Sequence, residues 1–180
     1  MKFKFYIFIY LIIIACSSDQ SGTDTTCLEK FRNLDTNKNK SQIALRLKIE
    51  KDDVLEVYFI NDPKELAFQA NKKIRKKVRG STEIQEVHFN LPNQIRPHKF
   101  RIDLGENNEQ KNIRIDEIKI LHNNNIISIK DSLIPYFFVI NNYLKLKDSN
   151  GNFDIQEKEK KRDPFITSNA TLNKKIKIEL

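Results

Sequence analysis

Three carboxylates lie in or beside the most regular strand-like segments of the chain: Asp103, Asp116 and Glu117. Two carboxylates about 5–10 Å apart can hydrolyse a glycosidic bond, one as the acid and the other as the base or nucleophile. Carboxylates in such segments also accept hydrogen bonds from loop N–H groups or pair with a cation across the sheet. We expect this structural role, because the chain has no Gly-x-Ser-x-Gly, no His-Glu-x-x-His and no glycine-rich phosphate loop. The sequence therefore predicts a protein that is not an enzyme.

Metal ligands are sparse in this sequence. The two cysteines and three histidines have neither the C-x-x-C nor the H-x-x-x-H spacing of a zinc site. Five side chains do match the ligand positions of a calcium-binding loop: Asp148, Asn150, Asn152, Asp154 and Glu159. The glycine of that segment is misplaced for such a loop, and the flanking residues are strand-like. We therefore predict no bound metal and no cofactor.

The densest charge feature is the basic run Lys72–Arg79, in which Arg75, Lys76 and Lys77 are candidate ligand-binding residues. Such a run can bind an anionic glycan or the phosphates of a lipid headgroup. It can equally be an edge strand whose lysines prevent sheets from pairing edge to edge. We favour the edge strand, because the run contains only two aliphatic side chains that could anchor it to a core.

Apolar and polar residues alternate along much of the chain from Ile43 onward, which is the pattern of strands with one buried face. Gly, Pro or Asn bounds nearly every run, and neither a long helical pattern nor an internal repeat is visible. The runs cover residues 43–49, 53–60, 74–78, 84–91, 100–104, 113–121 and 126–130. Short strands at this spacing predict an all-β sandwich or barrel.

The last third of the chain is less regular. We interpret Ile134–Lys147 as a buried loop that leads into a strand at Tyr143–Lys147. Asp148–Gly151 ends in Asn-Gly and predicts a hairpin turn. We expect the charged run Glu157–Arg162 to be a solvated loop. The segment Leu172–Leu180 is interpreted as a closing strand, with three side chains facing inward: Ile176, Ile178 and Leu180.

Several of these segments together resemble the galactose-binding-like jelly-roll domains that are attached to, or encoded beside, glycan-synthesis and glycan-processing proteins of the Bacteroidota. The resemblance depends on the order and spacing of five segments: Ile84–Pro92, Phe100–Gly105, Ile113–Ile120, Phe138–Asn141 and Asp163–Phe165. Leu104 stands where relatives tend to carry proline. The resemblance implies an antiparallel jelly-roll β-sandwich and a carbohydrate ligand.

Aromatic side chains are the natural place to look for a sugar site. Sugar-binding sandwich domains usually stack a ring on an exposed Trp or Tyr, because an aromatic face suits the apolar C–H face of a pyranose. The chain has no tryptophan. The candidate ligand-binding aromatic residues are therefore Tyr58, Tyr136 and Tyr143.

The first 15 residues have the layout of a signal peptide. Two lysines precede an apolar run that ends at Ala15 and is too short to cross a bilayer, which takes about 20 residues. Ile-Ile-Ala before Cys16 resembles the lipobox of bacterial lipoproteins, which are cleaved before the cysteine and acylated on it. The polar residues that follow contain too few apolar side chains to fold. We predict a signal peptide at 1–15, a flexible tether at 16–42 and a sandwich at 43–180.

Lipidation at Cys16 predicts a bacterial envelope protein held by its acyl chains in a membrane. We expect the outer membrane, on its periplasmic or surface face. The net charge of +8 favours anionic surfaces, but an exported lipoprotein rarely meets nucleic acid, so none is expected. Cys27 has no partner left for an intrachain disulfide. It can pair between molecules or carry a reactive thiol, and we interpret it as an ordinary tether residue.

Two functions fit this sequence. The first is a non-enzymatic, lipid-anchored sandwich that binds carbohydrate or supports a surface-glycan system. The second is an interaction lipoprotein that docks another envelope protein through the apolar residues of Pro135–Ile140 and has no small-molecule site. We favour the first, because the anchor, the strand pattern and the resemblance all agree with it.

Overall fold

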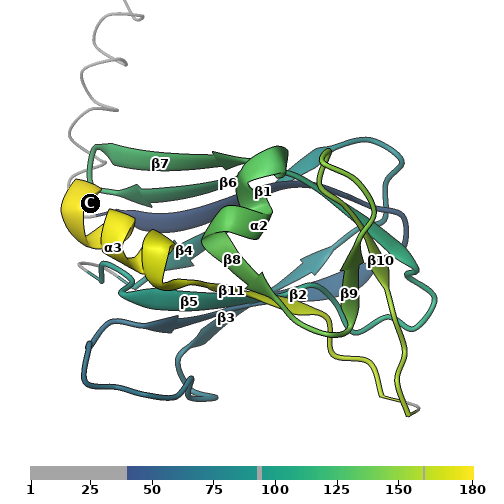
Figure 1. The fold of residues 1–180 in the computed structure, drawn as a ribbon, viewed down its shortest axis with the longest axis horizontal. Helices are drawn as coiled ribbons and strands as arrows, with labels where there is room; N and C mark the ends of the chain where they lie inside the picture. The colour runs from purple at the N-terminus through teal and green to yellow at the C-terminus, as the bar shows by residue number, and fades with distance from the viewer. Residues whose placement is uncertain (1–39, 93–94, 160) are drawn as a thin grey trace, which may run out of the picture.

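The computed structural model describes residues 40–92, 95–159 and 161–180 of the chain. The predicted signal peptide, Cys16, Cys27 and nearly all of the predicted tether lie outside the described residues. The described part forms two antiparallel sheets that pack face to face (Figure 1). This arrangement confirms the predicted all-β antiparallel sandwich. The first strand begins at Ser41, slightly before the expected boundary at Ile43.

Each sheet joins strands that are far apart in the sequence. In the six-stranded sheet, called sheet A, the spatial order is β4 (Gln85–Leu91), β1 (Ser41–Ile49), β6 (Asn112–His122), β10 (Asn152–Ile155) and β9 (Leu144–Leu146). The sixth strand of sheet A is β7 (Asn125–Lys130), which pairs with the second half of β6. In the five-stranded sheet, called sheet B, the order is β3 (Lys73–Val78), β2 (Asp53–Ile60), β5 (Lys99–Asp103), β11 (Phe165–Ser168) and β8 (Phe138–Ile140).

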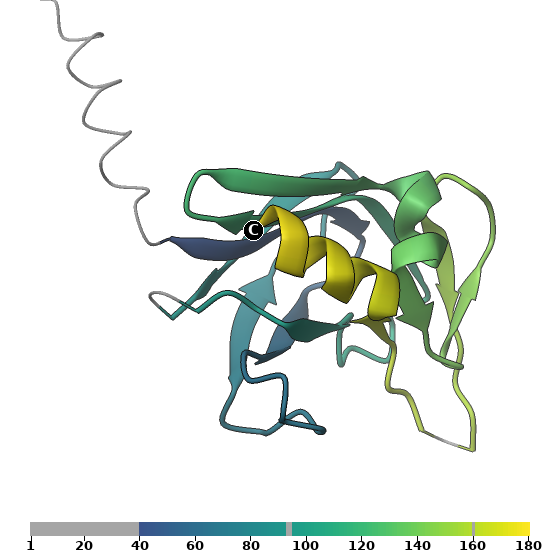
Figure 2. The same cartoon turned by 60° about the vertical axis from the view of Figure 1, so that its left-hand side comes forward.

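The helical segments gather on one side of the sandwich. They are the 3₁₀ turn η1 (Asp131–Leu133), α2 (Ile134–Phe137) and α3 (Ala170–Glu179). The helix α3 contacts β7 of sheet A and β11 of sheet B, and Figure 2 shows it lying across the side between the sheets. Because α2 contacts α3, the two helices together cover this side of the core.

The core lies between the sheets because alternate residues of each strand face inward. Four side chains of β1 are completely buried in this way: Ile43, Leu45, Leu47 and Ile49. Burying one aliphatic side chain of this size contributes about 1.5–3 kcal/mol relative to leaving it in water. The intervening residues of each strand face outward, because successive side chains alternate between the two faces of a sheet.

The predicted closing strand at Leu172–Leu180 is wrong, because this segment belongs to α3. The side chain of Asn169 accepts a hydrogen bond from the Leu172 N–H at 3.0 Å and caps the first turn. Leu172 and Ile176 are four residues apart and are buried on one helical face, whereas Ile178 is 70% exposed. Apolar residues two and four positions apart fit a strand and a helix alike. The hydrogen bond to the cap and the packing against the core therefore determine that this segment is a helix.

The interpretation of Ile134–Lys147 is correct only in part. The expected strand exists over Leu144–Leu146, but α2 and β8 precede it where we expected a loop. Pro135 stands in the first turn of α2, where a missing N–H removes no helical hydrogen bond. The predicted hairpin is confirmed: β9 and β10 pair antiparallel across 147–151, and Gly151 adopts the positive φ of 71° that the turn needs.

Candidate functional site

A group of charged and aromatic side chains covers the outer face of sheet B. Strand register assembles it: Glu56 of β2 lies between Arg75 of β3 and Asp103 of β5, and Tyr58 lies between Lys73 and Arg101. Phe165 of β11 is the next residue beside Asp103. We call this group the outer cluster, and it consists of Glu56, Tyr58, Lys73, Arg75, Arg101, Asp103 and Phe165.

Glu56 is the centre of one half of the outer cluster and is only 5% exposed. Lys73 Nζ donates to both of its carboxylate oxygens at 2.9 and 3.0 Å, and the Tyr58 hydroxyl donates at 2.9 Å. Arg75 is an ion-pair partner at 3.4 Å. Burial by itself raises the pKa of Glu56, but the hydrogen bonds from Lys73 and Tyr58 outweigh it and hold the pKa below its usual value. Glu56 is therefore a fixed anion that orients its neighbours.

Arg101 is the centre of the other half. Its guanidinium lies 3.9 Å from the ring centre of Phe165 and 5.2 Å from that of Tyr58, within cation–π range of both. The same guanidinium donates to the two carboxylate oxygens of Asp103 at 2.5 and 2.6 Å. Burial raises the pKa of Asp103 in spite of this pairing. Arg101 therefore fixes one carboxylate and two aromatic rings in a single rigid arrangement.

A hollow of about 160 Å³ opens beside the outer cluster. Its lining includes four carboxylates and one guanidinium, from Glu56, Asp103, Glu106, Asp163 and Arg162. Arg162 belongs to the run that we expected to be fully solvated, yet it turns inward and donates to the Gly105 carbonyl oxygen at 2.9 Å. Burial lowers the pKa of Arg162. Composition alone does not distinguish this inward arginine from the exposed charges before it.

The three basic candidate residues of β3 do not all face the same side of sheet B. Arg75 belongs to the outer cluster, and Lys77 faces the same side opposite Val54. Lys76 is opposite Leu55, whose side chain enters the core, so Lys76 faces the other side of β3. β3 is at the edge of sheet B, so the predicted position of this run at a sheet edge is confirmed.

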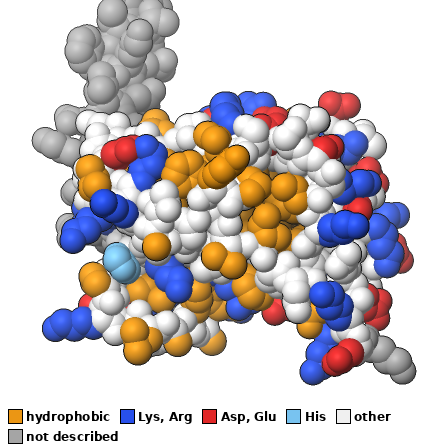
Figure 3. All heavy atoms as spheres, viewed as in Figure 1, with side chains coloured by type: hydrophobic (Ala, Val, Ile, Leu, Met, Phe, Trp, Pro, Cys, Tyr) orange, Lys and Arg blue, Asp and Glu red, His pale blue; other side chains and the backbone are white. Residues whose placement is uncertain are grey.

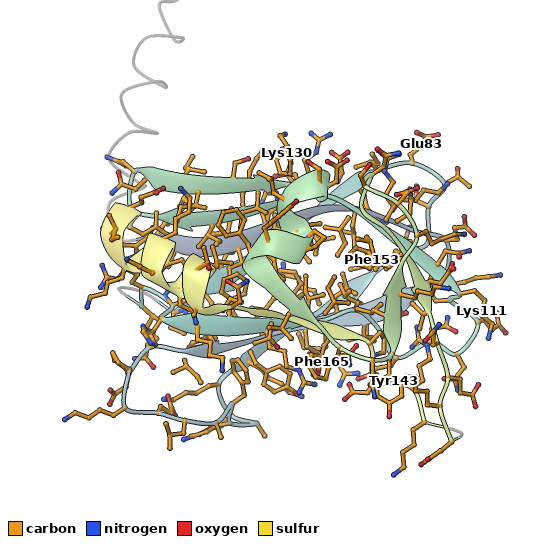
Figure 4. The ribbon with its side chains drawn as sticks, viewed as in Figure 1. Glu83, Lys111, Lys130, Tyr143, Phe153 and Phe165 are labelled. Atoms are coloured by element: carbon orange, nitrogen blue, oxygen red, sulfur yellow. The ribbon has the colours of Figure 1, made fainter. Side chains whose placement is uncertain are left out.

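The three candidate tyrosines do not form one site. Tyr58 belongs to the outer cluster. Tyr143 is near Phe165, since the backbone N–H groups of both residues donate to the Asn141 side-chain oxygen at 3.3 Å, and Figure 4 shows both on the same side of the sandwich. Tyr136 is 71% exposed on α2, beyond β8 at the opposite edge of sheet B from β3. Only Tyr58 and Tyr143 can therefore serve a ligand on the outer face.

The carboxylates Asp116 and Glu117 are on sheet A and do not meet Asp103 of sheet B. The pairing of β1 with β6 shifts between Arg46 and Leu47, so Asp116 is the extra residue of a β-bulge. Arg46 binds Asp116 at 3.2 Å. Glu117 is 4% exposed and accepts hydrogen bonds from Ser128 and Lys130. Both side chains have the structural role that we expected.

In the candidate calcium-binding loop, the Asp148 carboxylate already accepts hydrogen bonds from other residues of the loop. Asp148 accepts from the Asn150 N–H at 2.9 Å and from the Asn152 side chain at 2.8 Å. Across residues 40–92, 95–159 and 161–180, no group of three or more His, Cys, Asp or Glu side chains is placed to hold a metal ion. Nor does this part of the chain contain a helix of the length and hydrophobicity that a membrane span requires.

No protein-family model, curated protein or solved structure matches this chain. The outer cluster is therefore interpreted from its own geometry. It combines rigid hydrogen-bond donors and acceptors, two aromatic rings and an adjoining hollow. This combination can bind a polar ligand that also has apolar C–H faces.

Proposed function

We propose that this chain is a lipid-anchored protein of the bacterial envelope whose sandwich binds carbohydrate on the outer cluster. The observation that carries the proposal is the position of Arg101, paired with Asp103 and held against the rings of Phe165 and Tyr58. A sugar offers hydroxyl groups in a plane and C–H groups above it. The outer cluster offers partners for both.

The charges of the outer cluster favour a neutral sugar or an amino sugar over an acidic one. Each of its three cations already has a carboxylate partner: Lys73 and Arg75 pair with Glu56, and Arg101 pairs with Asp103. The hollow beside it presents more carboxylates than cations. An acidic sugar would have to displace these pairs, and binding would therefore lose their stabilisation.

The same pairing supports a binding function without catalysis. A two-carboxylate hydrolase needs one carboxyl group that is free to give up a proton to the leaving group. In the outer cluster both oxygens of Asp103 accept from Arg101, and both oxygens of Glu56 accept from Lys73. These carboxylates are suited to orient the cations of the outer cluster.

A binding experiment tests the carbohydrate proposal. The mature protein is screened on a glycan array that includes neutral, amino and acidic polysaccharides, and the hits are measured by calorimetry. We expect Phe165→Ala to weaken binding about tenfold, which corresponds to about 1.4 kcal/mol, because it removes an apolar surface and loosens Arg101. Tyr136→Ala removes an aromatic residue outside the cluster and should leave the affinity unchanged.

Two results would contradict this proposal. One is the absence of binding to every glycan tested, with a protein shown by circular dichroism to be folded. The other is an equal loss of affinity in Phe165→Ala and Tyr136→Ala. A ligand that dissociates in moderate salt would argue against a neutral sugar, because screening weakens contacts between charges.

The lipid anchor is tested separately. We expect mass spectrometry of the membrane-extracted protein to find an acylated Cys16 at the amino terminus. In a Cys16→Ala variant the acceptor thiol is missing, so the protein should lose this modification and appear in the soluble fraction. An unmodified amino terminus in the native protein would overturn the anchor and leave the carbohydrate site unaffected.

A further inference from the structure

Exposed large hydrophobic side chains lie on the helical side of the molecule. Among the described residues seven are exposed, and three of them belong to η1, α2 and α3: Leu133, Tyr136 and Ile178. These elements adjoin, because α2 contacts both η1 and α3. Figure 3 shows hydrophobic side chains gathered over α2. We call this surface the helix face. An apolar surface of this kind on a small domain marks a site of interaction.

Lysines accompany these hydrophobic side chains. Lys174 and Lys177 are exposed on α3 and have no ion-pair partner among the residues that the structure describes. Lys130, which directly precedes η1, is instead paired with Glu117 of sheet A at 2.9 Å. Exposed aliphatic and tyrosine side chains beside lysines suit the boundary of an anionic bilayer: the apolar groups enter the headgroup region and the ammonium groups stay among the phosphates. The charge therefore favours anionic lipid as the partner.

The amino-terminal segment joins the fold beside this face. The Lys40 carbonyl oxygen accepts a hydrogen bond from the Asn123 N–H at 2.7 Å, in the turn between β6 and β7. The carboxyl end of α3 lies at the same end of the sandwich (Figure 2). Between Cys16 and Lys40 are 23 residues, which span at most about 80 Å. An acylated Cys16 would keep the helix face at a high local concentration next to the bilayer, so weak contacts are enough.

We propose that the helix face lies on the surface of an anionic bilayer when the protein is anchored. The proposal rests on the lipid anchor proposed above. Leu133, Tyr136 and Ile178 enter the headgroup region, and Lys174 and Lys177 meet lipid phosphates. In this orientation the outer cluster, on the outer face of sheet B, remains open to a glycan. The anchor then fixes where the domain is, and the helix face fixes how it is oriented.

Tryptophan fluorescence tests the orientation, because the chain has no tryptophan of its own. The lipidated Tyr136→Trp variant is reconstituted into vesicles of phosphatidylethanolamine and phosphatidylglycerol, with and without brominated acyl chains. We expect a blue-shifted emission and at least twofold quenching by the brominated lipid. The matched control is Leu66→Trp: Leu66 is 92% exposed in the loop between β2 and β3, and its replacement should remain unquenched.

Further variants and vesicle compositions distinguish binding to anionic lipid from binding to a protein partner. Adding Lys174→Glu and Lys177→Glu to the Tyr136→Trp variant should reduce the quenching, and so should vesicles without anionic lipid. Similar quenching of both tryptophan variants, or none in either, overturns the proposal. A blue shift of the Tyr136→Trp emission in native membranes but not in pure lipid also overturns it and indicates a protein partner. Flotation with the vesicles reports the anchor independently, so failure of the anchor and failure of the orientation are distinguishable.

Discussion

Replacing Gly105 with alanine should destabilise the protein by about 3 kcal/mol or more. Gly105 has a φ of 112°, a conformation that residues with a Cβ rarely adopt. An added Cβ would stand 2.5 Å from Asp53 Cγ and even closer to Oδ2. Asp53 cannot move away cheaply, because it is 7% exposed and its Oδ1 accepts from the Glu106 and Asn107 N–H groups at 2.6 and 2.9 Å.

Thermal unfolding followed by circular dichroism measures this effect. A loss of 3 kcal/mol should lower the Tm by about 10 °C in a domain of this size. Asn108→Ala is the matched control, since Asn108 is exposed in the same loop. A Tm of Gly105→Ala equal to that of the wild type would show that the loop can shift away from Asp53. Because the Gly105 carbonyl oxygen also holds Arg162, we expect the variant to lose any ligand that uses the hollow.

Replacing Glu117 with glutamine should remove about 2 kcal/mol of stability at neutral pH and reduce the acid sensitivity of the protein. The hydrogen bond from Ser128 lowers the pKa of Glu117 to about 2, and Lys130 and Lys119 act in the same direction against the opposing effect of burial. The folded protein therefore binds a proton at this site less readily than the unfolded chain. Stability from Glu117 is complete above about pH 4.5 and is lost as the pH falls toward 2.

The measurement is the free energy of unfolding by urea between pH 2 and pH 6 for the wild type and for Glu117→Gln. Glu56 and Asp148 also have lowered pKa values, so the wild type loses stability in acid through several groups. The difference between the two proteins isolates Glu117, and we expect it to shrink toward zero at the acidic end. Glu83→Gln removes an exposed carboxylate (Figure 4) and should not change the profile. A constant difference at all pH values would contradict the assignment.

The strands of the sandwich were predictable because each carries its signal locally. In β4, for example, Val87, Phe89 and Leu91 are buried and alternate with exposed residues, as the sequence pattern indicates. The segment at α3 was not predictable in this way. Its apolar residues fit the period of a strand and the period of a helix. The helix forms because of the Asn169 cap and the packing against β7 and β11. A pattern that two structures satisfy equally is resolved only by contacts with the rest of the chain.

The outer cluster was predictable in part. Tyr58 and Arg75 were candidates from their residue types alone, and Asp103 was a candidate for its carboxylate. The outward positions of Glu56 and Arg101 follow from the alternation of their strands, but their partners do not. Phe165 carried no signal of a surface site, because a phenylalanine after a loop is as well suited to a core as to a sheet surface.

By itself, the sequence determined the position of most strands and which of their residues face outward, because alternation is a property of neighbouring residues. Only the tertiary structure decided which outward residues meet. Tyr58 contacts Arg101, and Arg101 contacts Phe165, because β2, β5 and β11 are adjacent in sheet B although they are distant along the chain. Strand order and register depend on how the whole core packs, and no short segment contains that information.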